Sequence, residues 1–477
     1  MQATHSQDKL NEHIQLVRDL LNKQKLIEAM VDQHESRNRD VVQSLVQRQH
    51  LAELDSKLQR LHTADIAHIL DILPIEDRLR IWDLLVSQRG GDILLEASEG
   101  VRRSLIQAMS EQQLQQALQQ MDGEDLAYVA EDIPEPQLQA RLDRLSSEEQ
   151  DWAKHAMEYD EDQVGHLMTR EMVVIREHNT LAQAEALLRE LKTLPIHTDK
   201  LFVVDGRGIL TGVLSLQNIL VNDAQQRVSA VMAKEVVRFS PDDHAGDASK
   251  AFERYDLISA PVINHRGKLI GRLTVDVVMD YIRDESSENV LNMAGVSGEE
   301  DLFASFWSSA RNRIPWLMIN LFTAFVASSV IGLFEDTILH LVALAALMPI
   351  VASVGGNTGN QTAALIIRAL AQGQITDDNS MRLVRKEISV SAINGLMLGL
   401  VVAAFTLLLY GDIHLAVVIA AAMLLTLIIA ALFGLAVPVY LHRSGRDPAL
   451  GSSVITTAAT DSISFLVFLG LASVFLV

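Results

Sequence analysis

The chain has 477 residues, of which 49% are hydrophobic and 21% charged, with a net charge of −21 and no cysteine. The acidity argues against nucleic-acid binding, because phosphate neutralisation requires clustered lysine and arginine. The lack of cysteine excludes disulfide scaffolds, thiolate metal sites and cysteine catalysis. The first 30 residues are polar and charged, so we expect no cleaved signal peptide.

The charge is unevenly distributed along the chain. Residues 311–477 contain eight acidic and eight basic side chains, so the whole net charge of −21 belongs to residues 1–310. We therefore predict a multi-domain protein in which acidic domains precede an apolar one. Its expected parts are an all-α superhelical N-terminal domain, an α/β module, and an α-helical membrane domain with five transmembrane helices.

The first 150 residues are rich in leucine, glutamine and glutamate and poor in glycine, a composition typical of helices. We expect an amphipathic helical extension over 1–45 and a helical domain over 46–160. Within that domain LHTADIAHILDILP at 61–74 resembles MDGEDLAYVAEDIP at 121–134, and each predicts a short helix that ends before a proline. Short helices repeated in this way predict a compact superhelical stack.

Two copies of one pattern follow, over residues 161–225 and 226–282. LFVVDGRGILTGVLSLQNIL at 201–220 aligns with APVINHRGKLIGRLTVDVVM at 260–279, and each copy predicts a helix, two strands around an Arg-Gly turn, and another helix. This order resembles a pair of CBS domains, and the resemblance implies one stacked α/β module. The alignment pairs two glycines of each copy: Gly208 with Gly267, and Gly212 with Gly271.

CBS modules often hold an adenosine nucleotide, in which a Ser or Thr and an Asp three residues later grip the ribose. The resemblance gives Ser215 and Thr274 this role. The positions three residues later are Asn218 and Val277, so neither copy keeps the Asp. ATP binding at the module therefore stays an open alternative.

Residues 283–313 connect the module to the apolar part. RDESSENVLNMAGVSGEEDLFASFWSSARNR is acidic at its start, helical in period, and basic where the apolar part begins. Two interpretations stay open: an ordinary connector, or a long helix that lies beneath the membrane helices.

Five segments of residues 314–477 are apolar enough for membrane spans, which need about 20 residues each. Every lysine and arginine of this part falls on one side of these spans, so we expect that side and the N-terminal domains to be cytoplasmic and the C-terminus to be outside. The protein is thus predicted to be a multi-pass protein of the cell membrane. The expected spans are 314–334, 337–354, 388–410, 413–441 and 450–477.

The last span, around TTAATDSISFLVF, contains one ionisable residue, Asp461. An intramembrane carboxylate costs about 2.5–3.5 kcal/mol on insertion scales, so it indicates a functional site by default. Hydroxyl side chains such as Thr457 surround it in sequence and could line a wet path. The alternative is an Asp satisfied locally by Ser and Thr hydroxyls at a helix interface.

A second signal is PIVASVGGNTGNQ at 349–361. We expect its glycines, among them Gly356 and Gly359, to break the helix and to allow either close backbone approach or positive φ. Asn357 and its polar neighbours offer oxygen atoms, and irregular backbone at membrane depth is tolerated only when it lines a cavity or is buried. Two copies of Asp461 across a two-fold axis would form a −2 site suited to a divalent cation.

These two motifs carry a family resemblance. The segment 349–361 with TAALIIRALAQG after it, together with DPALGSSVITTAATDSISF at 447–465, resembles the MgtE family of magnesium transporters. The resemblance implies a homodimer whose Mg²⁺ pore lies on the two-fold axis between the second and fifth spans. The pore aspartate falls on Asp461, and the expected lining residues are Gly356, Asn357, Gly359 and Thr457. It implies a transporter or channel rather than an enzyme.

The family's cytosolic domains bind Mg²⁺ and close the pore when internal magnesium is high. By position its regulatory ligands fall on Asp256, Asp280, Glu285 and Glu288, with Asp247 and Glu253 as weaker matches. Asn289 and Val277 stand where the family often has further carboxylates. Without the resemblance, such a charge run usually indicates a solvated helix face.

Two other functions stay open. One is a secondary exchanger that couples a divalent cation to Na⁺ or H⁺, although five spans without an evident inverted repeat disfavour it. The other is a membrane-anchored Mg²⁺ sensor without flux.

Overall fold

The computed structural model describes residues 10–23, 25, 52–293, 301–303, 306–375 and 377–477. The chain divides into two compact units. The first comprises residues 1–282 with 301–305, and the second comprises residues 283–300 with 306–477. The long helix α15 crosses from the first unit into the second at Arg283.

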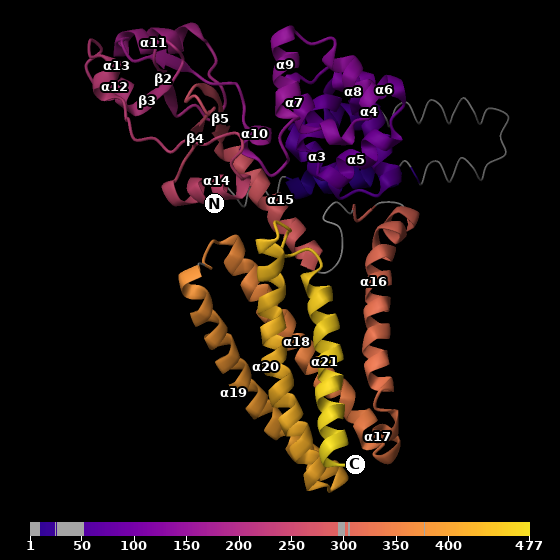
Figure 1. Cartoon of the computed structure of the whole chain (residues 1–477). Helices are drawn as coiled ribbons and strands as arrows, with labels where there is room; N and C mark the ends of the chain where they lie inside the picture. The colour runs from indigo at the N-terminus through magenta and orange to yellow at the C-terminus, as the bar shows by residue number, and fades with distance from the viewer. Residues whose placement is uncertain (1–9, 24, 26–51, 294–300, 304–305, 376) are drawn as a thin grey trace, which may run out of the picture. The chain divides into compact units, whose positions relative to one another are not determined.

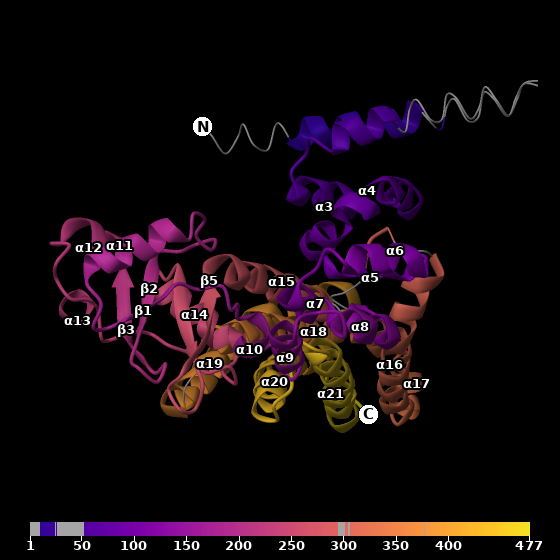
Figure 2. The same cartoon turned by 90° about the horizontal axis from the view of Figure 1, so that it is seen from above.

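The N-terminal domain is a stack of short helices, shown from above in Figure 2. Ser110, Asp122 and Ser146 each open a helix with a capping box, which satisfies backbone N–H groups that would otherwise lack acceptors. The predicted repeat is present: a short helix begins at Thr63 and another at Gly123, and after each of them a proline, Pro74 or Pro134, is the N-cap of a later helix. The helices are α3 (Thr63–Asp71), α4 (Ile75–Glu96), α5 (Glu99–Ala108), α6 (Glu111–Leu118), α7 (Gly123–Tyr128), η1 (Ala130–Asp132), α8 (Glu135–Leu142) and α9 (Ser147–Ala156).

The core of this domain is apolar and centred on α4, where Ile81, Trp82 and Leu85 are almost wholly buried. Residues 10–23 of the predicted extension are helical and bury Val17 and Leu21 in the same core. Most of the remaining extension lies outside the described residues.

The α/β module contains two small sheets. In the first, β1 pairs with β2 in parallel and β2 with β3 antiparallel, and in the second β4 pairs antiparallel with β5. Gly208 and Gly267 have φ of 81° and 73° at equivalent turns, as their alignment predicts, because glycine adopts this backbone without strain. The module's elements are α10 (Val164–Leu167), β1 (Val174–Arg176), α11 (Leu181–Glu190), β2 (Lys200–Val204), β3 (Leu210–Ser215), α12 (Leu216–Val221), α13 (Val228–Val231), α14 (Ala245–Tyr255), β4 (Ser259–Ile263), β5 (Leu269–Thr274) and α15 (Val275–Met293).

The two copies are joined at these turns. The backbone N–H of Leu210 donates to the Gly267 oxygen at 3.0 Å, and that of Leu269 donates to the Gly208 oxygen at 3.1 Å. The reciprocal hydrogen bonds make the repeat a single symmetric module.

The second unit is a bundle of long apolar helices (Figure 1). Helix α20 packs against α18, α19 and α21, while α16 packs against α21. Among the described residues, four helices are long and apolar enough to cross a membrane, namely α16, α19, α20 and α21. The helices are α16 (Phe306–Gly332), α17 (Glu335–His340), α18 (Ala343–Ala371), α19 (Asp377–Tyr410), α20 (Ile413–Arg443) and α21 (Ser452–Phe475).

The prediction for the second span was wrong in its bounds and its shape. Instead of a span over 337–354 that a glycine run ends, α17 comes first and α18 then continues for 29 residues through Pro349 and all three glycines. The predicted count of five spans therefore rests on α18, which is not among the four helices that are long and apolar enough to count as candidate spans. Glu387, next to the predicted third span, is buried within α19.

Candidate functional site

The glycines of α18 serve helix packing. A Cβ atom on Gly359 would lie 2.9 Å from the Thr456 Cγ2 of α21, and one on Gly355 would lie 2.8 Å from the Ser464 hydroxyl. On α20, a Cβ atom on Gly434 would lie within van der Waals overlap of the Gly359 carbonyl oxygen. Small residues that let backbones touch are typical of membrane helix interfaces. The expected close approach is thus confirmed, whereas positive φ was wrong because all three α18 glycines are helical.

A column of polar side chains joins α18 to α21. The Asn360 amide Nδ2 donates to the Thr457 hydroxyl at 3.2 Å, and the Ser453 hydroxyl donates to Asn360 Oδ1 at 3.4 Å. Residues 453, 457 and 461 are spaced by four, so they share one face of α21. The column therefore leads along that face towards Asp461.

Asp461 lies beside Gly356. A Cβ atom on Gly356 would be 3.6 Å from Asp461 Oδ1, an ordinary contact distance, so the carboxylate faces the α18 backbone at the point where that helix has no side chain. Asp461 is half-buried, and it has no hydrogen-bond or ion-pair partner among the residues that the structure describes. Its charge is available to a ligand.

The other expected lining residues differ in placement. Thr457 and Gly356 belong to the face around Asp461, while Gly359 is buried against Thr456 and Thr460 as a packing residue. Asn357 is exposed on a neighbouring face of α18, and its side chain makes no hydrogen bond to the residues that the structure describes. Sequence reasoning missed Ser453, although its spacing of four from Thr457 and Asp461 could have revealed it.

The expected regulatory carboxylates are spread over two helices. Asp247 forms an ion pair with Lys250 at 3.1 Å in the first turn of α14, Glu253 is exposed on that helix, and Asp256 ends it in the left-handed conformation. Asp280 and Glu285 follow on α15. Within the described part of the single chain, no three His, Asp or Glu side chains converge on a metal position.

Glu288 belongs to a polar contact inside the second unit. The buried Asn292 amide donates to Glu288 at 3.2 Å and to Asp447 at 3.3 Å, so the end of α15 is held to the loop between α20 and α21. Among the regulatory candidates, Glu288 is therefore the one that contacts the side chain, Asn292, by which α15 is joined to the α20–α21 loop.

The N-terminal domain concentrates negative charge near the module. Glu124 accepts hydrogen bonds from the Thr169 hydroxyl at 2.6 Å and from the Arg170 backbone at 2.7 Å. Next to it, burial and, to a smaller extent, the charge of Asp122 raise the pKa of Asp125 to about 6, although a backbone hydrogen bond from Asp122 opposes the shift. Like charges thus gather at this edge of the domain.

The residues expected to grip a nucleotide have structural roles. The Ser215 hydroxyl caps α12 by accepting from the Asn218 N–H at 3.1 Å, and Thr274 is buried at the end of β5. Nucleotide binding at these residues stays a prediction.

Comparison with known proteins covers all three parts of the chain. A family model described as the MgtE divalent cation transporter matches residues 348–471, the MgtE intracellular N domain matches 61–162, and CBS domains match 164–223 and 228–284. The cytosolic domain of the Mg²⁺ channel MgtE, solved in complex with ATP, is 28% identical with a TM-score of 0.44, and covers 50% of this chain and 98% of that one.

Two full-length relatives extend the similarity. The magnesium transporter MgtE of Bacillus subtilis is 28% identical over 427 residues, which is 89% of this chain and 94% of the relative. The magnesium transporter MgtE of Thermus thermophilus is 30% identical over 442 residues, which is 88% of this chain and 94% of the relative. With its helical N domain, CBS pair and Asp461-bearing helical bundle in the same order, the chain belongs to the MgtE family.

Proposed function

We propose that this protein is a Mg²⁺-selective channel that imports magnesium down its electrochemical gradient and closes when cytosolic Mg²⁺ binds its N and CBS domains. The observation that carries the proposal is Asp461, an unpartnered carboxylate at the end of a hydroxyl and amide column between α18 and α21. Mg²⁺ keeps several of its waters and binds through one or two carboxylates, so such a column suits the hydrated ion.

A homodimer would complete the site. One chain supplies a single carboxylate, half-buried on α21, and a two-fold axis beside it would bring two copies of Asp461 to one ion. Two carboxylates balance the charge of a divalent cation. Entry of that ion into a negative cell interior is favoured by about 4.6 kcal/mol per 100 mV, so no energy-coupling step is required.

The orientation follows from charge. The lysines and arginines that flank the apolar helices, such as Arg443 and Arg446, fall on the side from which α15 enters, so the N and CBS domains are cytoplasmic. Closure then works as a population shift: Mg²⁺ bound by acidic side chains favours the closed state in which those side chains come together. When internal Mg²⁺ falls, repulsion between the acidic faces separates them.

The conduction part is tested with purified protein in liposomes that contain a Mg²⁺-sensitive dye. We expect a Mg²⁺ flux that changes direction when the Mg²⁺ gradient is reversed. Gradients of Na⁺ or of pH should not change this flux. Influx that needs a Na⁺ or H⁺ gradient would establish an exchanger instead, and no influx of any divalent cation would establish a sensor.

The closing part is tested by patch recording with stepped Mg²⁺ on the cytoplasmic face. A variant in which four expected regulatory carboxylates are neutralised should form a channel that closes only at higher Mg²⁺. A control variant that loses four negative charges at exposed, unrelated positions should close at the same Mg²⁺ concentration as the wild type. If both variants shift equally, only net charge matters and the assignment of ligands is wrong. The neutralised residues are Asp256, Asp280, Glu285 and Glu288, and those of the control are Glu111, Glu148, Glu190 and Glu235.

A further inference from the structure

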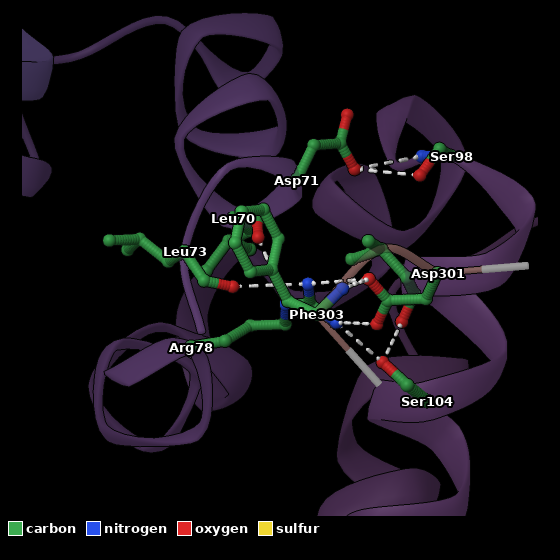
Figure 3. Close-up of polar contacts among 9 residues, drawn as sticks. Leu70, Asp71, Leu73, Arg78, Ser98, Ser104, Asp301 and Phe303 are labelled. Atoms are coloured by element: carbon green, nitrogen blue, oxygen red, sulfur yellow. Dashed lines mark hydrogen bonds and ion pairs between the residues drawn. The ribbon is translucent and has the colours of Figure 1, made fainter. Parts of the chain in front are cut away.

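A buried ion pair inside the first unit joins two distant parts of the chain. Arg78 of α4 is fully buried, and its guanidinium contacts the carboxylate of Asp301, whose side chain is 5% exposed (Figure 3). The pair is bidentate, with Nη1 donating to Oδ2 at 2.5 Å and Nη2 donating to Oδ1 at 3.1 Å. This two-bond geometry is the strong form of an arginine–carboxylate contact.

Every donor of Arg78 is used. Besides the two bonds to Asp301, Nε donates to the Leu70 carbonyl at 2.9 Å, Nη1 to the Ser104 hydroxyl at 2.9 Å, and Nη2 to the Leu73 carbonyl at 3.1 Å. A guanidinium has five N–H groups, so the set is complete. Three of these partners are neutral, and the nearby carboxylate of Asp71 bonds to Ser98 instead. Asp301 is therefore the anion that balances the buried charge.

Asp301 is remote from the N-terminal domain in sequence. It follows Arg78 by 223 residues, after the whole CBS module and the described part of α15, and it precedes Phe306, the first residue of α16, by five positions. The carboxylate also accepts from the Phe303 N–H at 2.9 Å, which shapes the segment 301–303 as a local turn. The pair thus fixes the chain just ahead of the first apolar helix.

The hold on this segment is concentrated in one side chain. Leu302 is 88% exposed and Phe303 is 39% exposed, so the neighbours of Asp301 bury little surface. We therefore expect the segment 301–303 to have two states, attached and detached. In the first the Asp301 carboxylate makes both bonds to Arg78, and in the second the buried guanidinium is left without its counter-ion.

We propose that Arg78 and Asp301 form a latch through which the N-terminal domain controls the chain that enters the membrane helices, in parallel with the route through the CBS module and α15. In the closed state the latch is engaged, and the Mg²⁺-dependent position of the N-terminal domain is transmitted directly to α16. The magnesium part of this inference rests on the proposed function, while the latch itself rests on the ion pair.

The latch is tested in the full chain by spin-label distances. Because the natural chain has no cysteine, cysteines introduced at exposed Gln112 and Trp307 are the sole labelling sites, and an excess of unlabelled chain restricts the measurement to one protomer. At high Mg²⁺ we expect a narrow distance distribution with Asp301 present and a broad one in Asp301→Asn. Equal widths in the two proteins would overturn the latch.

Asp132→Asn is the matched control. Asp132 forms an equally short ion pair with Arg102 at 2.5 Å and its side chain is 3% exposed, but both partners lie within the N-terminal domain. It should leave the distribution narrow, and a broad one would attribute the effect to general loosening of the domain and overturn the proposal. If Asp301→Asn fails to fold, the double variant Arg78→Met with Asp301→Asn removes the buried charge and should fold with a broad distribution.

Transmission to the membrane helices is tested by Mg²⁺ influx at stepped internal Mg²⁺. Asp301→Asn should raise the half-closing concentration by at least about fivefold, the lower range of coupling between sites, while Asp132→Asn leaves it unchanged. Unchanged closure together with a broadened distance would show that the latch transmits nothing. If the wild type itself shows no influx, the proposed function fails, and the distance measurement still decides whether the latch exists.

Discussion

The N-terminal domain and the membrane helices treat a charge that has left water in opposite ways. Arg78 is fully buried and all its donors have acceptors, whereas Asp461 is half-buried and has no partner among the described residues. A buried charge whose hydrogen bonds are all made stabilises one structure. Any rearrangement would leave that charge without partners in a site that water does not reach, which costs free energy. A charge without partners in the chain can bind a ligand reversibly. The contrast separates a charge that stabilises the fold from one that has no partner in the described part of the chain.

The largest test of this contrast is Asp461→Ala. It should reduce Mg²⁺ influx by about 30-fold or more, comparable to the loss of one member of a desolvated charge pair, without preventing assembly. Influx into liposomes, with size-exclusion chromatography as the folding check, measures both. Ser462→Ala is the control, since that hydroxyl donates within α21 to the Ala458 carbonyl at 2.8 Å. Wild-type influx in Asp461→Ala would remove the carboxylate from the ion path.

Arg78→Met tests the charge whose hydrogen bonds are all made. It leaves Asp301 buried without its cation, so the N-terminal domain should lose about 3–5 kcal/mol of stability. Replacing both partners, Arg78→Met with Asp301→Leu, should recover most of that loss, because an apolar pair needs no counter-ion. Hydrogen exchange of residues 63–118 in the full chain measures both. Equal losses in the single and double variants would show that packing of Arg78, rather than charge pairing, stabilises the domain.

A pair of glycine variants separates packing from the ion path. Gly359→Ala should destabilise the bundle by about 1–3 kcal/mol, because the new methyl group meets Thr456 and Thr460 at 2.9 Å and 3.0 Å. Gly356→Ala finds only ordinary contacts and should fold normally while changing influx, because its methyl group lies 3.6 Å from Asp461. Thermal unfolding and influx, measured on both, check the assignment. A Gly356→Ala protein with normal stability and unchanged influx would move the path away from this face.

The smallest effect is expected at Asp125. Its pKa of about 6 lies above the usual 3.8, so the folded state binds this proton more tightly and gains stability at low pH that is lost as pH rises through 6. Asp125→Asn should therefore stabilise the protein at pH 7.5 by less than about 1 kcal/mol, since solvent screens the partly exposed group, and have little effect near pH 4. Unfolding curves at both pH values test this. An equal effect at the two pH values would contradict it.

Local patterns predicted what depends on local chemistry. The paired glycines at 208 and 267 revealed the two copies of the module, because each requires the same positive φ. The sequence also predicted the helical repeat of the N-terminal domain and the family. It likewise placed Asp461 in the last apolar helix.

What could not be read depends on partners remote in the chain. The glycines of α18 predict a helix break when considered alone, and only the backbone of α20 at Gly434 shows that they make room for a neighbouring helix. Asn360 contacts Thr457 and Ser453 across almost a hundred positions, which no local periodicity encodes. The Arg78–Asp301 pair is more distant still, and neither residue stands in a motif.

That distance also sets an order of events during synthesis. Arg78 leaves the ribosome 223 residues before the carboxylate that neutralises it, which at 5–20 residues per second is a delay of about 10–45 s. Until then the nascent N-terminal domain has a guanidinium in its core without a counter-ion. Because α16 begins five positions after Asp301, the counter-ion of Arg78 is synthesised immediately before the first apolar helix. We therefore expect the core of the N-terminal domain to be completed at the same stage of translation at which the first apolar helix is synthesised.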